Sequence, residues 1–105
     1  MMEKLPYLID TPRLDGDKHL HRILLIMYEY PIEFFTSVRF INCSNPNQYF
    51  DALEDEEMNL TSSYIIPKSN GTKKRFIADN QMERVKEYLE QRGLISIQDE
   101  ANRSN

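Results

Sequence analysis

PNQYFDALEDEEMNLTSSYIIPKSNGTKKRFIA, residues 46–78, contains the clearest secondary-structure signals in the chain. Pro46 suits the first position of a helix, and apolar residues at helical spacing extend that helix to about residue 57. Two β-like runs follow, at residues 60–67 and 73–78. Between them, Asn70-Gly71 is a strong hairpin signal, because both residues tolerate the positive φ of tight hairpin turns. The stretch therefore predicts a helix followed by a β-hairpin.

The residues before this stretch predict a first helix and an ambiguous second element. Asp17 is a suitable N-cap, and apolar residues recur at helical spacing over residues 18–30, up to the stop before Pro31. Residues 32–41 have an apolar order compatible with a short helix, but their β-branched and aromatic content makes a strand almost as plausible. Residues 1–16 show no sustained period and predict an irregular arm.

A last helix is predicted over about residues 79–92, with Asp79 or Asn80 as its N-cap and Gly93 just past its end. This pattern divides the chain into an N-terminal arm (1–16), one domain (17–78), a C-terminal helical segment (79–97) and a disordered tail (98–105).

The composition is that of a globular protein with an uneven charge distribution. The 105 residues suit a single domain, 40% are hydrophobic and the net charge is −4. Residues 46–66 carry five acids and no base, whereas residues 67–75 carry four bases and no acid. A polyanion is expected to be drawn to the second segment, although an acidic whole lowers the expectation of DNA binding.

Several classes of function are not expected. Cys43 is the single cysteine, so neither an intramolecular disulfide nor a cysteine-based zinc site is expected. His19 and His21 lie on different faces of the first predicted helix, where they form a poor metal pair and are expected at the surface or its boundary. No arrangement typical of catalysis is present, so we expect no enzyme and no cofactor. No apolar run approaches a membrane span, and a cytoplasmic location is expected.

The order of predicted elements, helix, helix, turn, helix and hairpin, resembles that of the small winged helix-turn-helix proteins of phages and other mobile elements. The resemblance covers about residues 20–78. It is carried by Ile23-Leu24, Pro31-Ile32, Pro46, Leu53, Met58-Asn59-Leu60, Tyr64-Ile65 and the hairpin tip Asn70-Gly71-Thr72-Lys73. The chain departs from the family in two places. The family has a glycine before the position of Asn59, where this chain has Glu57 or Met58. Its third helix is also unusually acidic.

The resemblance implies an α+β, mainly α fold: a winged helix with a three-helix helix-turn-helix core and a hairpin wing, here with an extra C-terminal helix. It also implies binding to double-stranded DNA in the control of transcription or of a mobile element. In a helix-turn-helix, the N-terminal end of the second motif helix meets base edges in the major groove.

The candidate DNA-binding residues fall into two groups. At the start of the third helix, Asn47 and Gln48 suit bidentate pairing with adenine, and Asn45 is a candidate that is more readily explained as a helix cap. The wing supplies bases for phosphate contacts. These are Lys68, Lys73, Lys74 and Arg75. An exposed hairpin kept soluble by its lysines explains them about equally well.

Two alternatives concern protein partners. Residues 54–57, Glu-Asp-Glu-Glu, are expected to form a solvated face, but they are also compatible with a protein-interaction module that uses this acidic helix. The last helix carries one apolar stripe, which predicts a homodimer interface or, equally well, closure of the monomer's own core. The residues of the stripe are Met82, Val85, Tyr88 and Leu89.

Overall fold

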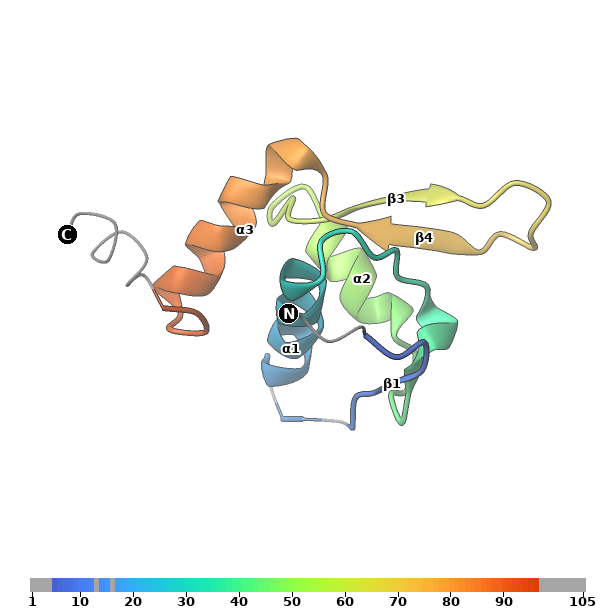
Figure 1. The fold of residues 1–105 in the computed structure, drawn as a ribbon, viewed down its shortest axis with the longest axis horizontal. Coiled ribbons are helices and arrows are strands. Elements are labelled where there is room, and N and C mark those ends of the chain that lie inside the picture. The colour runs from blue at the N-terminus through green and yellow to red at the C-terminus, as the bar shows by residue number, and fades with distance from the viewer. Residues whose placement is uncertain (1–4, 13, 16, 97–105) are drawn as a thin grey trace.

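The computed structural model describes residues 5–12, 14–15 and 17–96. In this part of the chain it has three α-helices and two two-stranded sheets, a small α+β fold (Figure 1). The elements in chain order are β1 (Ile9–Asp10), α1 (Lys18–Glu29), a 3-10 turn (Ser37–Arg39), β2 (Phe40–Ile41), α2 (Asn47–Glu54), β3 (Ser62–Ile65), β4 (Lys73–Phe76) and α3 (Asp79–Gln91). The predicted disordered tail, residues 98–105, lies outside the described residues.

The core lies where α1 packs against both α2 and α3. The apolar positions predicted for α1 are buried, and those of α2 and α3 meet them. The most deeply buried members are Ile23, Leu24 and Met27 of α1, Phe50 and Leu53 of α2, and Val85 and Leu89 of α3. Full burial of such side chains contributes about 1.5–3 kcal/mol each. Figure 1 shows the β3–β4 hairpin extending away from this helical body.

The segment between α1 and α2 contains no α-helix, so the predicted three-helix core is wrong at this point. Phe35 forms a bridge with Arg75 of β4, and only Ser37–Arg39 makes a single 3-10 turn. Phe40–Ile41 then pairs in parallel with Ile9–Asp10. The β-branched and aromatic content of the segment favours these extended pairings, which supply its backbone groups with partners from β4 and from the arm.

The N-terminal arm is attached to the body by β1 and by a buried arginine. Ile9 is buried, while Tyr7 and Leu8 stay exposed. The Arg39 guanidinium donates to the carbonyl of Tyr7 at 2.7 Å and to that of Pro6 at 3.0 Å. The arm is therefore not irregular throughout, because its residues 9–10 form a strand.

The β3–β4 hairpin is confirmed, but the positive φ expected at both Asn70 and Gly71 is found at Gly71 and not at Asn70. The φ of Gly71 is +83°, and Lys68 also has a positive φ, +63°. The loop is closed by the backbone N–H of Ile66, which donates to the Thr72 carbonyl at 2.8 Å. Inside it the Ser69 hydroxyl donates to the Ile66 carbonyl at 2.7 Å, so side-chain hydrogen bonding stabilises a wider loop.

Helix α3 begins one residue earlier than its predicted caps allow. Ala78 is the N-cap, and its backbone N–H donates to Oε1 of Gln81 at 3.1 Å. The same oxygen accepts the Ser62 hydroxyl at 2.8 Å, which fixes the start of α3 against β3. The predicted C′ glycine is confirmed, since Gly93 has a φ of +71°.

The apolar stripe of α3 belongs to the core of the monomer. Val85 and Leu89 are fully buried, and Met82 and Tyr88 are half-buried. The predicted dimer interface is therefore wrong for Val85 and Leu89, because side chains buried within one chain have no surface to offer a second one. The alternative reading of the stripe, closure of the core, holds for these two residues.

Candidate nucleic-acid interface

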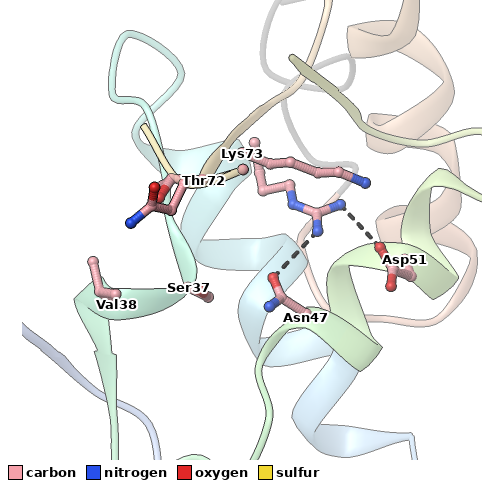
Figure 2. Close-up of a pocket in the computed structure, with 9 residues that line it drawn as sticks. Ser37, Val38, Asn47, Asp51, Thr72 and Lys73 are labelled. Carbon is pink, nitrogen blue, oxygen red and sulfur yellow. Dashed lines mark hydrogen bonds and ion pairs between the residues drawn. The ribbon is translucent and has the colours of Figure 1, made fainter. Parts of the chain in front are cut away.

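A groove of about 350 Å³ lies between the N-terminal end of α2, the 3-10 turn and the hairpin loop (Figure 2). Helix α2 contributes Asn47 and Asp51, which are one turn apart and share a face. The other lining residues are Ser37 and Val38 of the 3-10 turn and Asn70, Gly71, Thr72, Lys73 and Arg75 of the hairpin. Segments distant in sequence thus present polar side chains to one surface.

Arg75 is buried at the base of this groove, and the prediction that it contacts phosphate is wrong. Its side chain is 2% exposed, and Nη1 lies 3.1 Å from Oε1 of Glu54 and 3.2 Å from Oδ1 of Asp51. The guanidinium also lies over the Phe50 ring, with 5.1 Å between the guanidinium carbon and the ring centroid. Successive β-strand side chains point to opposite faces, so Arg75 turns inward where Lys74 turns outward.

The arginine determines which way the amide of Asn47 is turned. Nη2 of Arg75 donates to Oδ1 of Asn47 at 3.2 Å, one of the dashed contacts in Figure 2. A guanidinium has only donors, so the amide must present its oxygen to Arg75. The Asn47 side chain is exposed, and its NH₂ group is left to donate elsewhere. Asn47 is therefore oriented as a hydrogen-bond donor.

The other residues predicted to read bases do not line the groove. Gln48 is exposed and donates through Nε2 to the Ser44 carbonyl at 3.1 Å. Asn45 has a left-handed backbone with a φ of +53°, and the N-cap of α2 is Pro46, without a side-chain capping bond. The capping role predicted for Asn45 is therefore wrong, and its left-handed conformation, which asparagine tolerates, gives it a turn role instead.

The four predicted wing bases are placed differently from one another. Lys73 is exposed and lines the groove, and Lys68 is exposed on the loop outside it. Lys74 is half-buried, with its ammonium 4.4 Å from the centroid of the Phe34 ring. Together with the buried Arg75, this leaves Lys73 as the predicted base that faces the groove beside Asn47.

Asp51, like Ser37 and Val38, lines this groove without having been among the predicted site residues. Its side chain is 63% exposed, and it is paired with the buried Arg75. The available signal was its spacing of four residues from Asn47, which places the two side chains on one helical face. Glu54, predicted to be part of a solvated acidic face, is half-buried and also bonded to Arg75.

Charges around the groove are balanced by these pairs. Asp51 and Glu54 are paired with Arg75, and Lys73 lines the groove beside them, two acids against two bases. Two carboxylates that would repel phosphate are thus partly neutralised from below by one guanidinium. Asp55, Glu56 and Glu57 remain exposed at the C-terminal end of α2.

The titratable groups with shifted pKa values lie away from the groove. His21 of α1 and the Tyr88 hydroxyl of α3 are 2.9 Å apart, a contact that joins the two helices. Burial, and then the charge of Arg92, lowers the pKa of His21, while burial raises the pKa of Tyr88. His19 is buried and stacked on Tyr49, so its predicted surface position is wrong.

Cys43 is half-buried, and burial raises the pKa of its thiol. A raised pKa lowers the fraction of thiolate, the form that reacts and binds metals, in keeping with a packing role. Among the described residues, no group of three histidine, cysteine, aspartate or glutamate side chains is placed to hold a metal ion. None of the described helices has the length and apolar character needed to cross a membrane.

Comparisons with protein-family models, with curated proteins and with solved structures find no match for this chain.

Proposed function

We propose that this protein is a winged-helix protein that binds double-stranded DNA and regulates transcription or a mobile element. The observation that carries the proposal is the groove, in which the N-terminal end of α2 and Lys73 of the hairpin lie on one surface. A helix end that enters a major groove and a basic side chain that meets the flanking phosphate must share a surface in this way.

The arrangement of elements supports the winged-helix part of the proposal. Helix α2 is followed directly by a hairpin, and β4 of that hairpin pairs back onto Phe35, between α1 and α2. The 3-10 turn stands where a helix-turn-helix has its first motif helix. The hairpin is thereby held beside α2 as a wing, with its loop next to the helix end.

The orientation of Asn47 gives the proposal a specific preference. An amide that presents its NH₂ group suits the acceptors N7 and O6 of guanine, and the free oxygen of the Asp51 carboxylate suits the amino group of cytosine. The preferred partner of this pair of side chains is therefore a G·C base pair, instead of the adenine predicted from residue type alone.

A titration with 20-bp duplexes at 50 and 200 mM NaCl tests the proposal. The Lys73→Ala variant is expected to bind more weakly and to reduce the salt slope by about 0.9, the value for one phosphate contact. Lys86→Ala, which removes a lysine of α3 outside the groove, is the matched control and should leave the slope unchanged. An equal salt slope in wild type and Lys73→Ala would exclude Lys73 of the hairpin as a phosphate contact.

Base reading is tested on the best duplex selected from a random pool. Asn47→Ala is expected to lose roughly 1–3 kcal/mol of binding free energy on that duplex and little on random DNA. Equal losses on the selected duplex and on random DNA would mean that Asn47 contacts only the DNA backbone. A selected duplex without a G·C pair at the position read by Asn47 would refute the assignment of Asn47 as a hydrogen-bond donor.

A protein-interaction module is the second candidate, because Asp55, Glu56 and Glu57 are exposed together. This candidate predicts no duplex binding at 50 mM NaCl and binding of a lysine-rich peptide. The peptide should be released by the triple change Asp55→Asn, Glu56→Gln and Glu57→Gln, and should be unaffected by Lys73→Ala.

A further inference from the structure

A cluster of aromatic rings lies on the face of the hairpin that points away from α2. Phe34, Tyr64 and Phe76 contact one another edge-to-face, with ring centroids 5.9–6.5 Å apart. The ammonium of Lys74 lies 4.4 Å from the centroid of Phe34 and 5.9 Å from that of Tyr64. The cluster is formed by two hairpin strands together with the extended segment that precedes the 3-10 turn. We call these four residues the aromatic face.

The aromatic face is open to solvent. Phe34 is 47% exposed and Tyr64 is 44% exposed. The pairing of Tyr64 with Lys74 and of Phe76 with Ser62 puts the two hairpin rings and the lysine opposite the side occupied by Arg75. Phe34 contacts both of these rings. The face is therefore separate from the groove beside α2.

The charge on this face has one sign. From residue 58 to residue 78 the sequence has four bases and no acid, and the single base on the aromatic face is Lys74. A positively charged side chain set among exposed rings, without a carboxylate, complements a ligand that is anionic and carries flat unsaturated rings. Unpaired nucleotides have both properties, since their bases stack on aromatic side chains and their phosphates attract lysine.

We propose that the aromatic face binds single-stranded nucleic acid, with bases stacked on Phe34 and Tyr64 and a phosphate beside Lys74. A second copy of the chain fits this surface less well. A two-fold contact centred on the face would bring the two Lys74 ammonium groups toward each other, and such like-charge contacts are unfavourable. The inference uses residues outside the duplex groove and does not depend on the proposed function.

Fluorescence anisotropy with a labelled 15-nucleotide mixed-sequence DNA strand, at 50 and 200 mM NaCl, tests the inference. Phe34→Leu and Tyr64→Leu are each expected to weaken binding roughly 5- to 150-fold, the range for loss of one base–aromatic stack. Lys74→Gln should reduce the salt slope by about 0.7, the value for one contact on a single strand. Tyr7→Leu, which removes an exposed tyrosine of the arm, should leave binding unchanged.

A strand of the same length without bases provides the second arm, since stacking requires bases and electrostatic attraction does not. The wild type should bind this abasic strand much more weakly. Equal binding of both strands, no binding of the normal strand at 50 mM NaCl, or an equal loss in Tyr7→Leu would each overturn the inference. A wild-type dimer that becomes a monomer in Tyr64→Leu, as measured by sedimentation, would also overturn it and assign the face to a second copy.

Two further controls separate folding and duplex binding from this site. Thermal unfolding followed by circular dichroism confirms that each variant is folded, and Tyr64→Leu decides alone if Phe34→Leu does not fold. Asn47→Ala should weaken duplex binding and leave single-strand binding intact, while Tyr64→Leu should do the opposite. A wild type that binds the single strand but no duplex would therefore refute the proposed function alone, and a wild type that binds duplex but no single strand would refute this inference alone.

Discussion

Arg39 and Arg75 are both buried, yet they hold two regions of the molecule in different ways. Arg39 is 5% exposed and bonds main-chain carbonyls of Pro6, Tyr7 and Phe34, with Glu33 as its one charged partner. Arg75 is 2% exposed, and its guanidinium bonds side chains of α2, those of Asn47, Asp51 and Glu54.

The two regions are therefore held in place by different kinds of partner. Main-chain carbonyls are present whatever the residue type, so Arg39 fixes the path of the arm with little demand on the arm's own sequence. Arg75 depends on the identity of three side chains, and in return it orients Asn47 and neutralises two acids. The arm is held through hydrogen bonds to its main chain, while the groove is held by ion pairs and a hydrogen bond between particular side chains.

The largest effect is expected from Arg75→Met. The change leaves the Glu54 and Asp51 carboxylates without their shared partner at the base of the groove. Removing one side of a buried ion pair costs about 3–5 kcal/mol, and we expect about 3 kcal/mol because both carboxylates keep contact with water. Urea unfolding at pH 7 measures the change. Arg22→Met, at an exposed arginine of α1, is the control and should stay within about 0.5 kcal/mol.

Arg39→Met should cost less, about 2 kcal/mol, because two of the three carbonyls that it releases, those of Pro6 and Tyr7, lie on a surface arm and can bind water. The loss should also be local. Amide hydrogen exchange should accelerate at Thr11, whose N–H donates to the Ile41 carbonyl at 3.0 Å, and stay slow in α2. If the two arginine variants destabilised α2 equally, the contrast between main-chain and side-chain anchoring would be lost.

Asp51→Asn should change stability by less than about 0.5 kcal/mol, because exposed ion pairs contribute little and an amide oxygen still accepts from Arg75. It removes one negative charge from the groove, so affinity for random duplex DNA at 50 mM NaCl should rise. An unchanged affinity in this variant would show that the charge balance of the groove does not control binding.

The smallest effect concerns His21, whose contact with Tyr88 joins α1 to α3 without a buried ion pair. Its folded-state pKa is lowered, so the unfolded chain binds more protons as the pH falls through the unfolded value near 6.5. Stability should therefore decline between pH 7.5 and 5.5. The decline of the unfolding free energy with falling pH should be shallower in His21→Gln than in the wild type. An equal pH dependence in the two proteins would contradict the assignment of this decline to His21.

Local patterns predicted the element types well. Helices α1, α2 and α3 and the β3–β4 hairpin all lie where periodicity and turn residues placed them, because those signals act between neighbours in sequence. Residues 32–41 could not be assigned in this way. Phe35 pairs with Arg75, which is 40 residues away along the chain. Phe40–Ile41 pairs with the arm, which is about 30 residues away.

The candidate site was predicted in place but not in detail. Asn47 and Lys73 do line the groove, whereas Asn45, Gln48, Lys68 and Lys74 do not. A run of three bases, Lys73-Lys74-Arg75, looks uniform in sequence. In the hairpin its members lie at the groove, over aromatic rings and inside the protein, and strand geometry directs Lys74 to the face opposite Lys73 and Arg75.

From local sequence patterns one could predict the three α-helices and the β3–β4 hairpin, the acidic segment beside a basic one, and the end of α3 shortly before Gly93. The burial of the α3 stripe, the inward direction of Arg75 and the exposure of Phe34 and Tyr64 could be seen in the folded structure alone. Burial and pairing depend on which surfaces meet in space. Backbone preference is local, but the partner of a charge or a ring is chosen by packing between segments distant in sequence.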